Sequence, residues 1–306
     1  MLRDAYGIDA PSISKIDFPS HNYVYKAVAG NAAYVVKIFS GLDFTPRKSG
    51  SKAEHIDYES AILDQLERCN APAVSALHDR HGNSIHEMGS RKAMVFRYID
   101  GHAFDNTPAH IANAAQALAQ VHRSLPEDVI ATRDFDYRTF ISLWINRLPT
   151  LRANPRFDEC IYDTAGFDKL TKRIEGWLEL ESDWEKLTWV HGHGDLHPRN
   201  FLFQGDAVFV FDFQAARFIP RLEDVADGMI EFGICKDALT PERMECFLAH
   251  YEAIFPLSVI ERSHLQEFLL AEAVTKILTT LEGEFLYGYK ASSNRMKALL
   301  DFCLAN

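Results

Sequence analysis

The chain has 306 residues, of which 47% are hydrophobic, 12% aromatic and 25% charged, and its formal net charge is −11. This composition is that of a globular protein and excludes a disordered chain, a collagen-like repeat and a coiled-coil rod. An acidic surface repels phosphate backbones, so we expect no binding to nucleic acid. The sequence contains no run of 18 apolar residues, so we expect no membrane-spanning helix.

The cysteines and the first residues indicate a cellular compartment. The five cysteines are widely spaced and form no CxxC pair. An odd number of isolated cysteines argues against a disulfide framework or a zinc ribbon and favours reduced thiols. The first residues, MLRDAYGIDAPSIS, lack the apolar core of a signal peptide. We therefore expect a cytoplasmic protein; the sequence leaves its oligomeric state open.

The first third of the chain mixes strands with one helix. Two β-rich runs, 23–28 and 33–39, flank Gly30-Asn31, a pair that favours a hairpin turn. A helical period follows over 52–68, and the run AMVFRYI at 93–99 predicts another strand. Residues 1–100 therefore predict a small, β-rich N-terminal lobe.

The remainder, 101–306, reads as mostly helical. Helices are predicted over 111–125, 137–148 and 167–180, and several more after Pro241. A short β pair within 201–213 is the exception. The chain is thus predicted to be an α+β protein of two lobes that meet near residue 100, and clefts between such lobes often bind small molecules.

The segment 191–213, HGHGDLHPRNFLFQGDAVFVFDF, carries the clearest chemical signal. Asp195 lies in a loop marked by glycine and proline, and Asn200 follows five residues later. Asp212 ends the apolar run 207–211, which would deliver its carboxylate to a cleft. Phosphoryl transfer needs an acceptor that orients the attacking hydroxyl, and hard oxygen ligands for Mg²⁺. These three side chains supply that set.

The strings HGDLHPRN and FDF resemble the signature of the aminoglycoside phosphotransferase/choline kinase-like superfamily, small-molecule relatives of protein kinases. The resemblance covers roughly residues 15–230. It implies a protein-kinase-like fold, ATP as phosphoryl donor and a small-molecule hydroxyl as acceptor. It further implies that Asp195 is the catalytic, base-like residue and that Asn200 and Asp212 hold Mg²⁺.

The family also requires a lysine on a strand of the small lobe and an acidic partner on a helix. The run AYVVKIF provides Lys37, which by strand alternation shares one face with Val35 and Phe39 and would project beside these apolar groups into the cleft. Glu54 and Glu59, both in the predicted helix 52–68, compete as its partner. Glu59 lies within the apolar stripe of that helix, where an unpaired charge is costly, whereas Glu54 lies off it. We therefore predict a Lys37–Glu59 pair in the nucleotide site.

Two further segments correspond to nucleotide-binding parts of the family. FPSHNYVYKAV resembles the turn that covers the phosphates, with Ser20 and Asn22 as side-chain donors where glycine is usual. VFRYIDG resembles the hinge between the lobes, and its backbone at Arg97, Tyr98 and Ile99 is predicted to meet the adenine. An ordinary hairpin turn is the alternative interpretation of the first segment.

Three residues correspond to supporting positions of the family. His122 ends an amphipathic helix and is predicted to be buried and structural. His193 is expected to pack against the backbone of the catalytic loop. Asp224, in PRLEDVAD, is expected to brace that loop; an acid at a helix N-terminus is the simpler alternative.

The acceptor is predicted to bind against the large lobe, because ATP occupies the small lobe in this architecture. Glu231, Glu282 and Glu284 are the candidate contacts for a cationic acceptor. An aminoglycoside, choline, homoserine or a similar molecule fits the resemblance.

Two other functions remain as alternatives. His191, His193, Asp195 and His197 form an HxHxD pattern with a further histidine, which suits a zinc-dependent hydrolase. In such hydrolases the last histidine directly follows the aspartate, whereas here Leu196 intervenes. The second alternative is a pseudokinase that binds a nucleotide without transferring phosphate.

Overall fold

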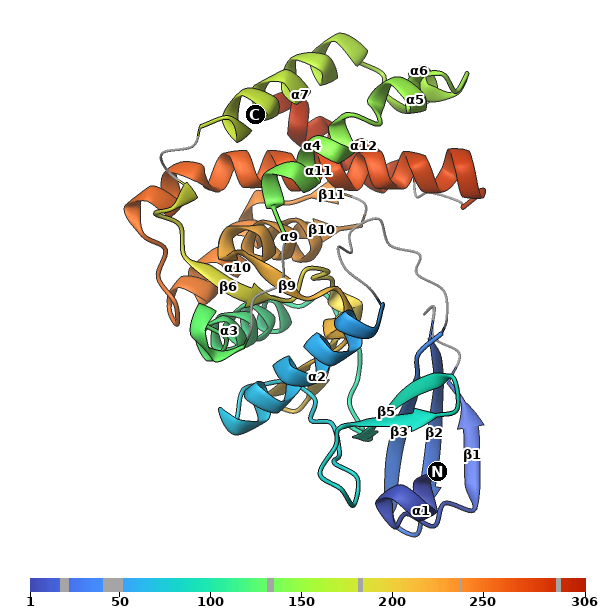
Figure 1. The fold of residues 1–306 in the computed structure, drawn as a ribbon. Coiled ribbons are helices and arrows are strands. Elements are labelled where there is room, and N and C mark those ends of the chain that lie inside the picture. The colour runs from blue at the N-terminus through green and yellow to red at the C-terminus, as the bar shows by residue number, and fades with distance from the viewer. Residues whose placement is uncertain (17–21, 41–51, 131–134, 181–183, 237, 290–292) are drawn as a thin grey trace.

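The structure, a computed structural model, describes residues 1–16, 22–40, 52–130, 135–180, 184–236, 238–289 and 293–306. Figure 1 shows a strand-rich part that contains the N-terminus and a larger, mostly helical part that contains the C-terminus. We call the part up to residue 97 the small lobe and the part from residue 108 the large lobe. In the described residues, no helix is long and apolar enough to cross a membrane.

The small lobe is built on a five-stranded antiparallel sheet with strand order β1-β2-β3-β5-β4. Its strands are β1 (Ser12–Lys15), β2 (Tyr23–Ala29), β3 (Ala32–Ile38), β4 (Ile85–Met88) and β5 (Arg91–Arg97). The predicted hairpin is confirmed: β2 and β3 flank Gly30, whose φ of 60° a glycine adopts without strain. The strand predicted at 93–99 runs instead over 91–97, and the backbone N–H of Tyr98 still donates to the carbonyl of Ala33 in β3 over 2.9 Å.

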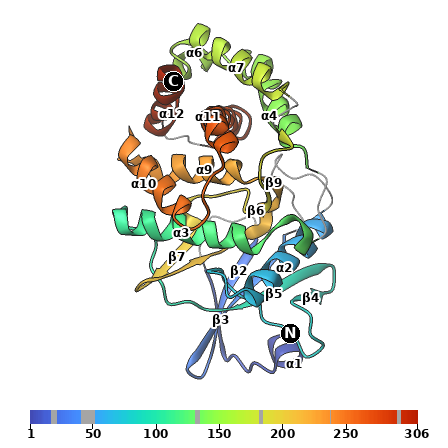
Figure 2. The same ribbon diagram turned by 90° about the vertical axis from the view of Figure 1, so that its left-hand side faces the viewer.

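Two helices accompany the sheet. The short helix α1 (Leu2–Tyr6) packs with Leu2 against a small core of Ala27, Val36 and Val95. Helix α2 (Lys52–Arg68) has the predicted bounds and lies between the sheet and the large lobe (Figure 2). Its buried apolar side chains belong to the main hydrophobic core, which spans both lobes: Ile56, Ile62, Leu63 and Leu66.

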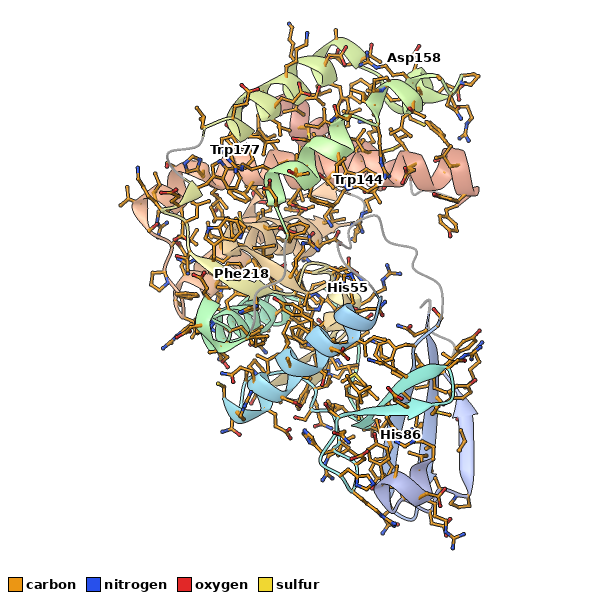
Figure 3. All side chains as sticks on the ribbon, in the orientation of Figure 1. His55, His86, Trp144, Asp158, Trp177 and Phe218 are labelled. Atoms are coloured by element: carbon orange, nitrogen blue, oxygen red, sulfur yellow. The ribbon has the colours of Figure 1, made fainter. Side chains whose placement is uncertain are left out.

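The large lobe is mainly helical. Its helices are α3 (Pro108–Ser124), α4 (Tyr137–Ile145), α5 (Leu148–Arg152), α6 (Phe157–Cys160), α7 (Thr164–Leu178), α9 (Arg221–Gly233), α10 (Pro241–Glu252), α11 (Val259–Tyr287) and α12 (Ser293–Ala305). The helix predicted over 137–148 is two helices, because Pro149 lacks an N–H group and favours a helix start. Trp177 of α7, labelled in Figure 3, packs edge-on against Phe268 of α11 with ring centroids 5.0 Å apart.

Short strands carry the segment with the chemical signal. Strands β6 (Trp189–Gly192) and β9 (Arg217–Pro220) pair antiparallel, as do β7 (Phe201–Gln204) and β8 (Ala207–Val210) and the two-residue strands β10 (Ile234–Cys235) and β11 (Ala238–Leu239). Single 3₁₀ turns, η1 (Glu127–Val129), η2 (Pro198–Asn200) and η3 (Phe213–Ala215), complete the lobe. The predicted β pair at 201–213 is confirmed. The catalytic loop predicted from the sequence therefore leaves β6 and returns through η2 to β7.

Candidate active site

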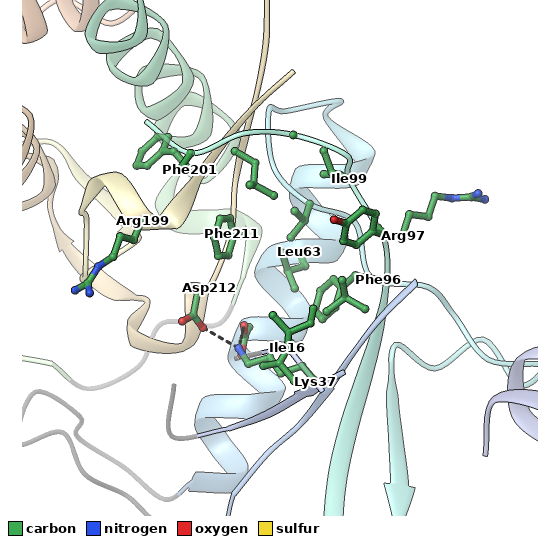
Figure 4. A pocket seen from close by; sticks show the side chains of 18 residues that line it. Ile16, Lys37, Leu63, Phe96, Arg97, Ile99, Arg199, Phe201, Phe211 and Asp212 are labelled. Carbon is green, nitrogen blue, oxygen red and sulfur yellow. Dashed lines mark hydrogen bonds and ion pairs between the residues drawn. The ribbon is translucent and has the colours of Figure 1, made fainter. Parts of the chain in front are cut away.

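Lys37 lies at the meeting point of the two lobes. Its Nζ atom is 2.7 Å from Oε1 of Glu59 on α2 and 2.8 Å from Oδ1 of Asp212, just before η3 (Figure 4). Burial by itself lowers the pKa of a lysine, but the carboxylates of Asp212 and Glu59 outweigh it and raise the pKa of Lys37 above its ordinary value. The lysine is therefore charged, and the predicted pairing with Glu59 is present.

A cavity of about 350 Å³ opens beside this ion pair (Figure 4). Most of its walls are apolar, and Lys37, Glu59 and Asp212 lie at its polar end. The last residue of β5 and the two that follow, which are predicted to meet adenine, also line it: Arg97, Tyr98 and Ile99. Such a cavity can hold a nucleotide, with the flat base in the apolar part and the phosphates beside the buried cation.

Several residues that line this cavity are not predicted from the sequence. They come from distant segments: Ile16, Val24, Leu63, Val74, Phe201, Leu202 and Phe211. Strand alternation is the signal in the sequence that indicates one part of the lining: Val35 and Lys37 are two residues apart in β3, and both line the cavity. The contribution of β7 follows from its contact with the segment after β5, where the N–H of His102 donates to the carbonyl of Phe203 over 2.8 Å.

Asn22 bridges the two lobes at the start of β2. Its side-chain amide donates to the side chain of Gln214 in η3, and its oxygen accepts from the backbone N–H of Ser40 over 3.2 Å. Ser20 lies outside the described residues. Binding of phosphate by this turn stays a prediction.

The catalytic loop is held by a buried carboxylate. Asp224, at the start of α9, accepts from the backbone N–H groups of His193 over 2.6 Å and Gly194 over 2.9 Å. Burial alone raises the pKa of an aspartate, but these donors and His122 lower the pKa of Asp224 below its ordinary value. The backbone immediately before Asp195 is thereby fixed, while the side chain of Asp195 remains 48% exposed. The expected bracing role of Asp224 matches these contacts.

The two supporting histidines are buried as expected. His122 donates from Nε2 to Asp224 over 3.0 Å and accepts at Nδ1 from the hydroxyl of Tyr251 over 2.8 Å. His193 accepts at Nδ1 from the backbone N–H of Asp195 over 3.3 Å and donates from Nε2 to the carbonyl of Phe211 over 3.0 Å. His193 therefore joins the catalytic loop to the segment that ends in Asp212.

The two predicted metal ligands lie at neighbouring backbone positions. The side-chain amide of Asn200 donates to the carbonyl of Asp195 over 3.0 Å, and its own carbonyl accepts from the N–H of Phe211 over 3.0 Å. Asp212 follows with φ 67° and ψ 56°, a left-handed conformation that is uncommon outside glycine and clusters at functional sites. The amide oxygen and the carboxylate are the hard donors that Mg²⁺ prefers, so this pair fits the ion.

The variant Asp224→Asn is expected to reduce the free energy of unfolding by about 3 kcal/mol, because an amide cannot accept all the hydrogen bonds that converge on this buried carboxylate. The pKa of Asp224 is lowered in the fold. Its stabilisation is therefore fully present above about pH 4 and is lost as the pH falls through the folded-state value. Urea unfolding at pH 7 and pH 3, with the exposed Asp128→Asn as control, measures this difference. A loss no larger than that of the control would contradict it.

The three predicted acceptor contacts are all engaged in ion pairs. Glu231 on α9 contacts Lys276, at 2.7 Å, and Arg295. Burial raises the pKa of Glu231, but the two cations outweigh it and bring that pKa down to about 2. On α11, Glu282 lies 2.5 Å from Arg147, and Glu284 contacts Arg156.

Glu231 is connected to the catalytic loop through two further side chains. Lys276 also contacts Asp227 at 2.5 Å, and the other carboxylate oxygen of Asp227 accepts from the N–H of Leu196 over 3.1 Å. A single chain of contacts therefore leads from Glu231 to the residue after Asp195. Binding of the acceptor by any of the three carboxylates stays a prediction.

The histidines of the HxHxD pattern point to different partners. Nδ1 of His191 contacts the hydroxyl of Tyr58, His193 contacts Phe211, and Nε2 of His197 is 3.9 Å from Asp195. Among the residues that the structure describes, no three His, Cys, Asp or Glu side chains gather as a metal site. The geometry therefore gives no support to the zinc hydrolase alternative.

Comparison with known proteins identifies the family. The sequence model of the phosphotransferase enzyme family matches residues 12–252, and the chain belongs to this family. The chain is 22% identical over 244 residues to a homoserine kinase of Polaromonas naphthalenivorans, a match that covers 76% of this chain and 69% of that protein. The predicted superfamily is thus confirmed, and the protein is a small-molecule phosphotransferase that uses a hydroxyl group as acceptor.

Solved structures confirm the kinase-like fold. Spectinomycin phosphotransferase in complex with ADP and spectinomycin superposes with a TM-score of 0.67 at 15% identity, covering 99% of this chain and 96% of that one. A choline kinase of Streptococcus pneumoniae superposes with a TM-score of 0.62 at 18% identity, covering 99% and 96%. The α+β, two-lobed expectation therefore holds.

Proposed function

We propose that this chain transfers the γ-phosphoryl group of ATP, in the presence of Mg²⁺, to a hydroxyl group of a small molecule. The observation that carries the proposal is the Lys37 ammonium held between Glu59 and Asp212 at the polar end of an apolar cavity. A charged lysine in that place attracts the phosphates of a nucleotide whose base fills the apolar part. The backbone of residues 97–99 then lies along the base.

The catalytic loop supplies the second half of the proposal. The carboxylate of Asp195 is exposed and accepts a hydrogen bond from the acceptor hydroxyl, which orients that oxygen for attack. Asn200 and Asp212 would hold Mg²⁺, which neutralises charge on the phosphates when it is bound. Asp224 and His193 keep the loop in place. We place the boundary between the nucleotide-binding and the catalytic lobe at residue 100.

A coupled ADP-release assay tests this function. The purified chain is incubated with ATP, Mg²⁺ and one of homoserine, choline, an aminoglycoside or spectinomycin, and each reaction is repeated with EDTA. We expect acceptor-dependent ADP release with at least one compound and none with EDTA. If the chain binds the nucleotide but releases no ADP with any of the acceptors, the result would favour a nucleotide-binding pseudokinase.

We further propose that the acceptor binds on the large-lobe side of Asp195. Its hydroxyl must lie within a hydrogen bond of Asp195 and face the γ-phosphate at the same time. The chain of contacts from Leu196 through Asp227 and Lys276 to Glu231 borders that side of the loop. The homoserine kinase among the relatives supports a small acceptor that carries both a positive and a negative charge.

Exchange of Glu231, Glu282 and Glu284 for glutamine, one at a time, tests this placement. If the acceptor is cationic, we expect the change at Glu231 to raise its KM about tenfold and to spare the KM for ATP, because one charge-assisted contact is lost. Smaller increases are expected at the other two positions, which lie on α11. Steady-state kinetics with each substrate varied provides the measurement, and Glu242→Gln, an exposed position on α10, is the control. Unchanged acceptor KM in all three variants would show that the pocket is elsewhere or that the acceptor is uncharged.

A further inference from the structure

Two consecutive residues of α2 reach opposite lobes. Glu59 contacts Lys37 in the sheet, whereas the hydroxyl of Tyr58 lies 2.5 Å from Nδ1 of His191 in β6 of the large lobe. Both members of the second contact are buried, with 6% of Tyr58 and none of His191 exposed. Tyr58, the residue before Glu59, therefore anchors α2 to the large lobe, which carries the catalytic loop.

The rest of α2 repeats this division. Towards the sheet, Asp57 contacts Lys92 at 2.8 Å. Towards the large lobe, the side-chain amide of Gln65 donates to the carbonyl of Ser124 over 3.3 Å. The buried apolar residues of the helix pack in the main hydrophobic core, which spans both lobes and includes Phe39, Met94 and Phe96 of the small lobe. Helix α2 is thus held from both lobes, by Asp57 and Glu59 on the side of the sheet and by Tyr58 and Gln65 on the side of the large lobe.

His191 is suited to accept a hydrogen bond from Tyr58. Its Nε2 atom lies 3.3 Å from the backbone carbonyl of Glu127, so Nε2 carries the proton and Nδ1 is the acceptor. Burial lowers the pKa of His191, which favours this neutral form. The phenol of Tyr58 then donates to Nδ1.

His191 is also firmly connected to the catalytic loop. Its backbone N–H donates to the carbonyl of Leu125 at the end of α3 over 3.0 Å, which fixes His191 within the large lobe. The next residue, Gly192, passes so close to Asp224 that an added Cβ would lie 2.7 Å from a carboxylate oxygen. Asp195 follows three residues later. A displacement of His191 therefore displaces the loop that Asp224 holds.

We infer that Tyr58 is a positioning residue for the phosphotransferase site: through its hydrogen bond to His191 it sets α2 relative to the catalytic loop and so keeps Glu59 on Lys37. The contact of Lys37 with Asp212 is a further link between the lobes, and Asp212 is 29% exposed there. Because the Tyr58–His191 link is fully buried, it holds this geometry whether or not a nucleotide is present. The catalytic consequence rests on the proposed function.

The variant Tyr58→Phe removes the hydroxyl and keeps the ring. We expect the affinity for Mg·AMP-PNP to fall five- to tenfold, the size of one buried hydrogen bond, with kcat reduced and the KM of the acceptor unchanged. Tyr137→Phe is the matched control, because its buried hydroxyl donates to Glu272 over 3.1 Å entirely within the large lobe. Equal effects of the two variants on nucleotide affinity would overturn the inference.

Two further measurements separate positioning from packing. The carbonyl oxygen of asparagine occupies nearly the place of Nδ1, so His191→Asn should retain most of the affinity that His191→Leu loses. Combination of Tyr58→Phe with Glu59→Gln should cause little loss beyond that of Glu59→Gln alone, since both act through Lys37. Additive losses, or equal effects of the two His191 variants, would show that Tyr58 serves packing alone.

Hydrogen exchange tests the Tyr58–His191 link without requiring catalytic turnover. In the absence of nucleotide, amides of α2 should exchange about tenfold faster in Tyr58→Phe than in the wild type and in Tyr137→Phe, while α3 stays unchanged. If the wild type phosphorylates none of the acceptors, the proposed function fails and this measurement still decides the link. Unchanged exchange in α2 would overturn the inference even where the enzyme is active.

Discussion

Replacement of Asp195 by asparagine is expected to lower turnover by a factor of about 10² to 10⁴, the contribution of a positioned general base, and to leave the affinity for ATP within about twofold. The amide has nearly the size of the carboxylate but cannot accept the proton of the acceptor hydroxyl. Nucleotide affinity is spared because Asp195 does not line the cavity beside Lys37. The loop keeps its backbone, since Asp224 holds the N–H groups of the two preceding residues and not the Asp195 side chain.

Single-turnover and steady-state rates with the true acceptor, together with titration of the nucleotide, provide the measurement. Asp206→Asn, in the exposed turn between β7 and β8, is the control for the loss of one negative charge. Near-normal turnover of Asp195→Asn would remove Asp195 from the catalytic role.

Removal of the carboxylate of Asp212 is expected to weaken Mg²⁺-dependent ATP binding at least a hundredfold, whereas Asn200→Ala should weaken it about tenfold. A charged ligand holds a divalent ion more strongly than a neutral amide does. Asp212 also forms one side of the ion pair around Lys37, so its loss disturbs the metal and the lysine together. Asn200 contributes one amide oxygen and does not contact Lys37.

The backbone of Asp212 decides which substitution to use. With φ 67°, alanine at this position would be strained, whereas asparagine tolerates the left-handed conformation well. Asp212→Asn therefore separates the loss of charge from backbone strain, and Asp212→Ala is the second variant. Calorimetric titration of ATP with and without Mg²⁺ compares the two with the wild type. Equal Mg·ATP affinity in the wild type and Asp212→Asn would contradict the metal role.

The sequence alone determined the parts of this protein that depend on short spacings. Asp195, Asn200 and Asp212 lie in one segment of 18 residues, and their order predicts the chemistry before any fold is known. The period of the helix 52–68 placed Glu59 inside an apolar stripe, and a charge there requires a partner. The structure shows that partner to be Lys37. The hairpin around Gly30 and the apolar strand ahead of Asp212 are local in the same way.

The tertiary structure decided what depends on residues far apart in the chain. Tyr58 and His191 are 133 positions apart, and no periodicity of either segment relates them. The pattern around His191 suggested a zinc ligand, whereas the fold brings a phenol from another lobe to its Nδ1 atom. From the sequence Glu231 is a candidate contact for a cationic acceptor, but the fold pairs it with Lys276 and Arg295 of the chain itself. Local sequence fixes which face of a helix is apolar; only the packing of distant elements decides which polar groups meet in the space between them.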